Sequence, residues 1–339
     1  MAESARPMLL CGDIGGTNTT LALFPADGAG PPRRLAAYAS ADAPGLEHFV
    51  ERFLGIEAEG IEAACFAVAG PVARDRVATT NLPWLVEAVS LSTGLGGAPV
   101  FLLNDLEAIA WGVAGLAADE VAVLNAGRAA VAGNAAVIAA GTGLGEAGLV
   151  WDGARHLPFA TEGGHADFAP RSEREMRLLR YLQNRWDHVS WERVLSGPGL
   201  VHLLEFLRDV EGHRDADQVL AGVGERDRPA AVSAAALERG IPSARAALEL
   251  FASLYGAEAG NLALKMKATG GVYLAGGIAP KILPALTDGT FRAAFVAKGR
   301  FAGFLADVPV RVILAPHVGL RGAAAYLRAR RASPSARPA

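Results

Sequence analysis

Cysteine is scarce in this 339-residue chain, and neither of its two cysteines suggests chemistry. Cys11 and Cys65 both lie in apolar segments that predict buried strands. Small buried thiols are typical of protein cores in a reducing compartment, so we expect neither a disulfide nor a cysteine-based metal site. The residues before Met8 show no export signal, and we therefore expect a cytoplasmic protein.

The sequence also lacks an excess of charge and a long apolar run. Its net charge is −3 and its Lys and Arg residues are scattered, which argues against a nucleic-acid partner. The longest uncharged stretch, between Arg128 and Glu146, contains Asn134, Thr142 and several glycines, so it predicts a strand and a loop and no membrane partner. Hydrophobic residues make up 51% of the chain, enough for packed cores, and the length favours two domains.

Two common nucleotide-binding motifs are missing or out of context. No G-x-x-x-x-G-K-[ST] sequence occurs, which excludes a P-loop enzyme. Gly143, Gly145 and Gly148 match G-x-G-x-x-G, but residues 149–153 predict a strand and a turn where a dinucleotide site needs a helix. We therefore reject a dehydrogenase.

A glycine-rich loop, residues 12–18, lies between two short apolar runs. This pattern predicts two antiparallel strands joined by a tight turn. Glycines let backbone N–H groups converge on an anion, and Thr17 and Asn18 add side-chain donors. Asp13 places a carboxylate where a phosphate-bound metal ion could use it. An ordinary hairpin turn is the alternative to a phosphate site.

Asp105 follows a predicted buried strand, residues 99–103, and precedes a predicted helix, residues 106–115. Ligands bind at this edge in open α/β sheets. The alternative is that Asp105 only caps the helix. The glycine loops elsewhere in the chain favour a general base.

A second strand, glycine turn and strand occur at residues 135–151, roughly 130 residues after the first. The repeat suggests an internal duplication, with two related lobes. Other predicted strands cover residues 63–69, 77–80, 271–275 and 310–314, and predicted helices cover 45–54, 172–185, 198–207, 242–267 and 318–330. Ser172 and Glu175 predict a capping box, and Met176, Leu179 and Leu182 an apolar face.

Residues 161–168 place Glu162, His165 and Asp167 around flexible glycines. A metal site is one interpretation, but the spacing is not H-E-x-x-H. Carboxylates and an imidazole suit the hydroxyls of a neutral sugar better. Glu192 is ambiguous by itself, because an ion pair with Arg193 would also account for it.

Taken together and in order, these motifs resemble those of the bacterial glucokinases of the hexokinase/actin-like ATPase superfamily. The resemblance runs from about Leu10 to Arg328, and the stretches around Glu162 and Glu192 are its most specific parts. The Cys-rich zinc motif of the repressor-type sugar kinases is absent, which points to the zinc-free branch. The matching motifs are residues 12–18, 80–84, 103–105, 141–145, 162–168, 192–199 and 274–278.

The resemblance implies an α/β, two-lobed actin-like ATPase fold (RNase H-like and duplicated) with a cleft between the lobes. Residues 1–115 with 306–330 would form a small lobe, residues 116–305 a large lobe, and residues 331–339 a flexible tail. It also implies ATP-dependent phosphorylation of glucose at the 6-hydroxyl, with Mg²⁺, in a homodimeric protein.

The roles of individual residues follow from the same resemblance. Asp105 matches the catalytic base, and Asp13 lies near the metal ion without binding it directly. Thr161 departs from the Gly that relatives often carry there, and should stiffen the loop slightly. The sugar-binding positions are Asn104, Glu162, His165 and Glu192. The nucleotide positions are Gly12, Asp13, Ile14, Gly15, Gly16 and Thr17 (first phosphate motif), Gly141, Thr142 and Gly143 (second), and Gly276 and Gly277 (adenosine side).

Two other functions are compatible with the same fold. One is a kinase for another hexose, such as mannose or fructose. The other is a sugar-binding regulator without catalysis. Few residues precede the first strand and no basic helix is evident, which disfavours the regulator.

Overall fold

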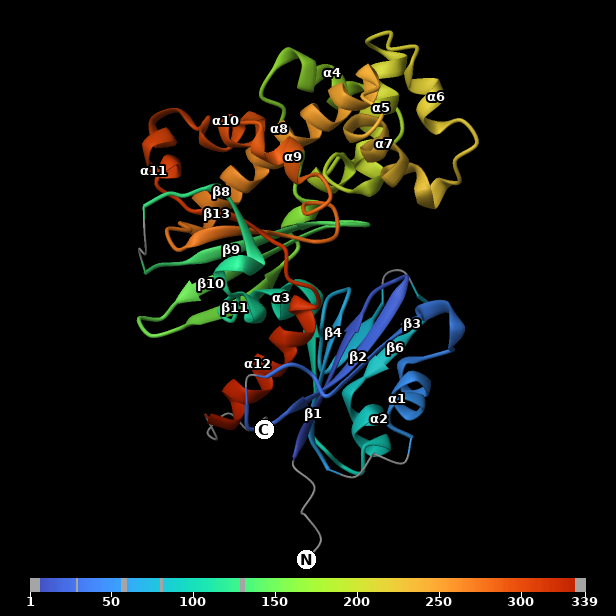
Figure 1. The fold of residues 1–339 in the computed structure, drawn as a ribbon, viewed down its shortest axis with the longest axis vertical. Coiled ribbons are helices and arrows are strands. Elements are labelled where there is room, and N and C mark those ends of the chain that lie inside the picture. The colour runs from blue at the N-terminus through green and yellow to red at the C-terminus, as the bar shows by residue number, and fades with distance from the viewer. Residues whose placement is uncertain (1–6, 29, 56–59, 80–81, 129–131, 333–339) are drawn as a thin grey trace, which may run out of the picture. The chain divides into compact units, whose positions relative to one another are not determined.

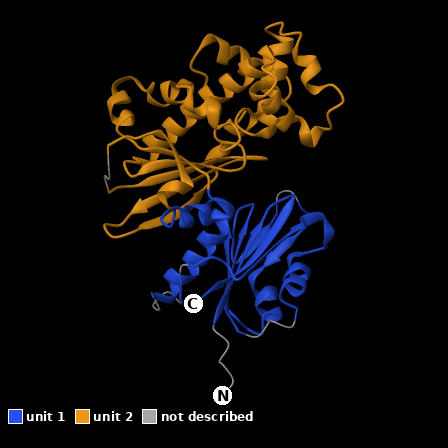
Figure 2. Cartoon of the chain, in the orientation of Figure 1, with its two compact units in different colours: residues 1–116, 315–339 blue, residues 117–314 orange. Residues whose placement is uncertain are grey.

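A computed structural model describes residues 7–28, 30–55, 60–79, 82–128 and 132–332 of the chain. The chain forms two compact units, residues 1–116 with 315–339 and residues 117–314 (Figure 2). The second boundary lies after Leu314, beyond the expected residue 306, because the strand at 310–313 pairs within the sheet of the second unit. Thr80, Asn81 and most of the expected tail, residues 333–339, lie outside the described residues.

The first unit is built on a five-stranded sheet of order β3-β2-β1-β4-β7 (Figure 1). The first three strands are antiparallel, and β1, β4 and β7 run parallel. The sheet strands are β1 (Met8–Ile14), β2 (Asn18–Pro25), β3 (Arg34–Ala39), β4 (Ile61–Val68) and β7 (Val100–Asn104); β5 (Arg76–Ala78) and β6 (Leu85–Glu87) form a separate hairpin. The helices are α1 (Leu46–Leu54), α2 (Ala88–Gly94), α3 (Asp105–Val113) and α12 (Val318–Ala332).

Side chains point alternately to the two faces of this sheet along each strand, and apolar side chains lie on both faces. Leu10 and Phe66 face Phe49 of α1, whereas Cys11 and Cys65 face Leu320 of α12. The two cysteines are fully buried and opposite one another in register, as free thiols. The prediction that they are core residues is confirmed, and burial raises the pKa of both.

Helices α3 and α12 cross with their backbones in direct contact. A Cβ atom added to Gly322 of α12 would lie 1.7 Å from the carbonyl oxygen of Ala108 in α3. A Cβ added to Gly112 of α3 would lie 2.5 Å from the carbonyl oxygen of Val318 in α12. Because α3 begins at Asp105, this close crossing fixes the position of that carboxylate.

Gly322→Ala should therefore destabilise the protein by about 1–3 kcal/mol, since the added methyl group forces two helix backbones apart. Thermal unfolding of the variant measures this. Gly303→Ala in α11 (Ala302–Ala306) is a suitable control, because an added Cβ meets no atom within 4 Å there. Equal melting temperatures for Gly322→Ala and the control would contradict the close crossing.

The second unit contains a six-stranded sheet of order β11-β10-β9-β12-β13-β8. Its long central helix, α8, packs on one face and is surrounded by shorter helices (Figure 1). The strands are β8 (Val121–Asn125), β9 (Ala135–Ala140), β10 (Leu144–Trp151), β11 (His156–Thr161), β12 (Gly271–Ala275) and β13 (Val310–Ile313). The helices are α4 (Glu173–Gln183), α5 (Gly197–Asp209), α6 (Ala216–Leu220), α7 (Arg228–Leu237), α8 (Pro242–Met266), α9 (Leu283–Thr287), α10 (Thr290–Val296) and α11.

The two sheets share one topology. In each, three consecutive antiparallel strands are followed by two strands parallel to the first, so β9-β10-β11-β12-β13 repeats β1-β2-β3-β4-β7. Strand β8 is an addition at the edge of the second sheet. The predicted duplication is thus present in the strand order.

Two details of α4 differ from the prediction. Ser172 caps the N–H of Glu175, but the Glu175 carboxylate accepts the N–H of Arg171 at 2.6 Å and not that of Ser172. Leu178 and Leu182 form the buried face, whereas Met176 is 38% exposed. The predicted Leu182 is buried and Leu179 packs against the core, so only Met176 departs from the predicted face; the buried Glu175 carboxylate is paired with the Arg171 guanidinium at 2.6 Å.

Candidate functional site

The first glycine hairpin and Asp105 lie at the same edge of the first sheet. Ile14, Val68 and Asn104 are register partners across β1, β4 and β7. The hairpin turn begins after Ile14, and Asp105 comes directly after Asn104. The turn and Asp105 are therefore separated by two strand spacings, roughly 10 Å. This is the carboxyl edge of the parallel strands, where ligands bind in α/β sheets.

The hairpin turn is narrower than the sequence suggests. Strand β1 continues through Gly12, Asp13 and Ile14, so only residues 15–17 form the turn. Gly15 donates its N–H to Asn18, and the Ser40 hydroxyl donates to the carbonyl of Gly15 at 2.9 Å. Ser40, which no sequence pattern singled out, therefore anchors the turn.

Asn104, and not Asp105, caps α3. The Asn104 side-chain oxygen accepts the N–H groups of Leu106 and Glu107, and its amide nitrogen donates to the carbonyl of Gly70. Asp105 is the first residue of the helix and accepts the N–H of Leu106 at 2.9 Å. The helix N-terminus favours the carboxylate's negative charge. The predicted position at a strand–helix junction is confirmed, with the cap provided by the neighbouring residue.

Asp13 lies in β1 beneath the turn, close to the start of α12. Burial raises the pKa of the Asp13 carboxyl, and nearby His317 partly offsets this. Gly319 is also adjacent, because a Cβ added there would lie 3.4 Å from Asp13 Oδ2. Sequence reasoning missed His317 and Gly319, although a strand followed by a helix start was predicted there, the same signal that identified Asp105.

In the second unit, the two remaining glycine motifs are neighbours. Strands β9 and β12 are parallel and adjacent, and they end at Ala140 and Ala275. Gly276 has a φ of 80°, and a Cβ there would lie 2.4 Å from the carbonyl oxygen of Ala140. Gly141 and Gly277, by contrast, have no atom within 4 Å of an added Cβ.

Six of the glycines predicted at the phosphate and adenosine motifs differ in the space beside them. Gly12 and Gly276 are required by packing, since an added Cβ would lie within 2.5 Å of a neighbouring atom, whereas at Gly143 that atom is the end of the flexible Glu192 side chain. Gly141 and Gly277 border open space, whereas a Cβ added to Gly15 would lie 3.3 Å from the Asn18 carbonyl oxygen. Open space beside flexible backbone suits a phosphate group.

Glu192 contacts the second glycine turn. Its Oε2 atom accepts the N–H of Leu144 at 2.9 Å and lies 2.4 Å from a Cβ added to Gly143. The alternative, an ion pair with Arg193, is not observed: the Arg193 guanidinium lies over the Trp186 ring, 4.5 Å from its centroid. The carboxylate is thus held at the edge of the sheet.

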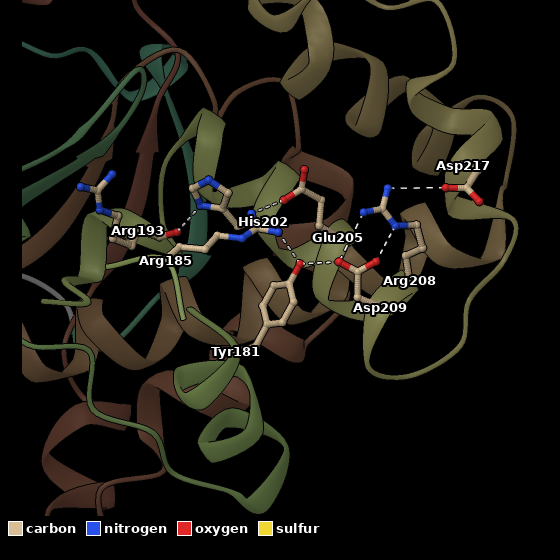
Figure 3. A network of polar contacts seen from close by, with 8 residues as sticks. All are labelled: Tyr181, Arg185, Arg193, His202, Glu205, Arg208, Asp209 and Asp217. Carbon is tan, nitrogen blue, oxygen red and sulfur yellow. Dashed lines mark hydrogen bonds and ion pairs between the residues drawn. The ribbon is translucent and has the colours of Figure 1, made fainter. Parts of the chain in front are cut away.

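A polar network lies around α4, α5 and α6 (Figure 3), and its His202 contact holds the turn that carries Glu192. The turn η5 (Trp191–Arg193) is fixed by His202 of α5, whose Nδ1 donates to the Arg193 carbonyl at 2.9 Å. Burial lowers the pKa of His202, which favours this neutral form. From the same helix Glu205 pairs with Arg185, which also contacts Tyr181. Asp209, Arg208 and Asp217 extend the network along the surface.

Gly143→Ala should move the Glu192 carboxylate away from Leu144 without unfolding the protein, because a flexible side chain can shift. If Glu192 binds the sugar, we expect the KM for glucose to rise about tenfold, equivalent to about 1.4 kcal/mol. Steady-state kinetics measures this, with Gly303→Ala as the control. An unchanged KM would separate Glu192 from sugar binding.

The loop with Glu162 and His165 packs tightly against the start of β10. Cβ atoms added to Gly163 and Gly164 would lie 2.1 Å from Glu146 Oε2 and 1.9 Å from the Leu144 carbonyl oxygen. The Glu162 and His165 side chains are exposed, and His165 donates its N–H to the Glu162 carbonyl in the turn η4 (Gly163–His165). Asp167 pairs with His188 at 3.0 Å. The segment around Leu144 therefore contacts both the loop that carries Glu162 and His165 and the Glu192 carboxylate.

Among the described residues, no helix is long and apolar enough to cross a membrane. In the same part of the chain, no three His, Cys, Asp or Glu side chains gather into a metal-binding group.

Comparison with known proteins gives a consistent result. The family model "Glucokinase" matches residues 10–330. A glucokinase from Nostoc punctiforme is 41% identical over 333 residues, covering 94% of this chain and 98% of the relative. The crystal structure of a glucokinase from an Antarctic psychrotroph matches with a TM-score of 0.80 at 30% identity, covering 95% of this chain and 99% of that one. A glucokinase of the ROK family from Streptomyces griseus, solved with glucose and AMPPNP, shares the fold (TM-score 0.65, 22% identity, 95% and 99% covered).

Proposed function

Because the chain belongs to the glucokinase family, we propose that it transfers the terminal phosphoryl group of ATP to the 6-hydroxyl of glucose. The observation that supports this most directly is the placement of Asp105 at the same sheet edge as the first glycine hairpin. A carboxylate near a phosphate-binding turn is the arrangement that this reaction needs.

Asp105 is the proposed general base. Its carboxylate would accept a hydrogen bond from the sugar 6-hydroxyl, orient it toward the phosphorus, and take its proton as the new P–O bond forms. The transition state of phosphoryl transfer is loose, so alignment contributes more than proton removal. The short link from β7 to α3 and the Asn104 cap fix the backbone that carries this group.

The proposed sugar ligands are Asn104, Glu162, His165 and Glu192. The Asn104 amide oxygen is occupied by the helix cap and one of its N–H groups by Gly70, which leaves at most one N–H for a hydroxyl. The Glu192 carboxylate has accepted one N–H, and its remaining lone pairs can accept hydroxyl donors. Glu162 and His165 are exposed and free to form directed hydrogen bonds with a polyol.

The residues present fit Mg-ATP. Gly141 and Gly277 border open space, which suits phosphate and adenosine groups near the two glycine motifs of the second unit. Asp13 is a buried carboxyl whose pKa is raised by burial, and a cation nearby would stabilise its charged form. Bound Mg²⁺ would neutralise charge on the transferred phosphoryl group. Asp13 would hold it through water.

A coupled assay of ADP release tests the proposal with the purified chain. Glucose with ATP should give sustained turnover, whereas a panel of mannose, fructose and other hexoses should give much lower kcat/KM, because hydroxyl-reading sites discriminate sharply. Higher kcat/KM with another hexose would reassign the substrate. Glucose binding without ADP release would support the sugar-binding regulator.

We further propose a homodimer in the cytoplasm, by analogy with the family. The two free cysteines, Cys11 and Cys65, fit a reducing compartment. Sedimentation velocity of the purified chain measures the oligomeric state directly, and a monomer at micromolar concentration would contradict the dimer.

A further inference from the structure

Two buried glutamates outside the proposed catalytic machinery lie next to the sugar-binding loop. Glu146 of β10 is 1% exposed and Glu258 of α8 is 0% exposed. Glu258 accepts hydrogen bonds from Asn261 at 2.7 Å and Lys265 at 3.3 Å. The Oε1 atom of Glu146 has no hydrogen-bond partner among the described residues. Lys265 bonds to Glu258 and not to Glu146, so burying both groups as carboxylates would be costly.

Glu146 is also in direct contact with the loop. The Gly163 backbone lies so close to the Glu146 carboxyl group that an added Cβ would be 2.1 Å from Oε2. Thr161 ties the same segment together, donating to the Glu146 carbonyl at 2.9 Å and accepting the Gly163 N–H at 3.2 Å. A change of charge at Glu146 would therefore first affect the backbone of Gly163, which lies between Glu162 and His165 in the chain.

We propose that Glu146 is a positioning residue for the sugar site. Its side chain is a neutral carboxylic acid beside Glu258, and it packs against the loop that carries Glu162 and His165. This inference rests on the proposed function. Loss of the Glu146 proton would put a second negative charge into the buried pair. The loop would have to move outward to hydrate it, and the sugar ligands would move with the loop.

The charged groups around Glu146 support this assignment. Burial, and next the Glu258 carboxylate, raise the pKa of Glu146 to about 8, while Lys265 opposes them. Tyr255 of α8 lies nearby with its hydroxyl bonded to the Ile138 carbonyl. Lys298 donates to Asn261 and its charge also favours the Glu258 carboxylate, while burial lowers the pKa of Lys298. On the loop side, Glu162 and His165 are exposed.

The inference is tested by measuring the dissociation constant for glucose between pH 7 and 9.5 by calorimetry on the full chain. The values of kcat and KM are measured in parallel. If only the protonated form supports the loop, glucose binding should weaken about tenfold by pH 9, with a smaller change in kcat. Glu146→Gln copies the neutral acid in shape, so its dissociation constant should match the wild type at pH 7 and stay flat to pH 9.5.

Two further measurements keep the inference testable if Glu146→Gln folds poorly. Glu258→Gln removes the neighbouring charge and should move the loss of glucose binding to lower pH. Neutral Glu146 stabilises the fold fully below its ordinary pKa of 4.5, and this is lost as the pH rises to about 8. The melting temperature of Glu146→Gln should therefore exceed that of the wild type increasingly from pH 5 to 8.

Three results would overturn the inference. They are a wild-type dissociation constant that is flat to pH 9.5, an unchanged pH dependence in Glu146→Gln, and loss of glucose binding by folded Glu146→Gln at pH 7. Exposed Glu173→Gln on α4 is the matched control and should follow the wild type. A wild-type protein that fails to phosphorylate glucose would refute the proposed function and is a separate outcome, because binding is measured without ATP.

Discussion

Asp105→Asn should lower kcat for glucose phosphorylation by about 10²–10⁴-fold, the contribution typical of a positioned general base. The amide keeps the size of the side chain and can still contact the 6-hydroxyl, but it takes no proton. The dissociation constant for glucose should change little, because that interaction acts mainly in the transition state. Coupled kinetics and calorimetry measure the two effects separately.

The matched control is Asp119→Asn, which changes an exposed acidic residue at the turn 118–120. It should have wild-type kcat. Asn104 supplies the α3 cap, so Asp105→Asn should also melt close to the wild type. Near-normal turnover in Asp105→Asn would remove the proposed mechanism, whatever the binding result.

Glu192→Ala should reduce kcat/KM for glucose by about 10²-fold. Hydrogen bonds to a charged group contribute about 1.5–3 kcal/mol, and the variant also loses the group that holds Leu144 at the second glycine turn. Both sugar binding and the geometry of the turn should suffer, so KM rises and kcat falls.

Glu205→Ala in the polar network of Figure 3 provides the comparison. It removes the ion pair with Arg185 but leaves the His202 contact to the Arg193 carbonyl in place. We expect a change of less than threefold in kcat/KM, since partly exposed ion pairs contribute about 0–1 kcal/mol. Equal losses in the two variants would show that Glu192 acts only through the fold of this region.

Local patterns predicted the elements that carry the motifs. The glycine hairpin, the strand before Asp105 and the long helix α8 all follow from residue periodicity and turn residues, and the structure confirms them. They are encoded by neighbours in the sequence. The repeated strand order was only suggested by two short glycine turns, because pairing between distant strands leaves no local signal.

The supporting contacts could not be predicted in the same way. Ser40 anchors the first turn from 25 residues away, and Glu192 reaches Leu144 from 48 residues away. Glu146 carried no signal in the sequence, because its significance depends on Glu258 across the core. Met176 was wrongly placed on the buried face of α4, where Glu175 is buried beside Arg171, a contact that the apolar pattern does not show.

The most direct test of the central claim uses glucose labelled with ¹⁸O at the 6-hydroxyl, incubated with ATP and the purified chain. If the sugar oxygen attacks the terminal phosphorus, mass spectrometry should find the label retained in the bridge between C6 and phosphorus of glucose 6-phosphate. Phosphate on another hydroxyl, or release of ADP and free phosphate without a sugar phosphate, would contradict the account.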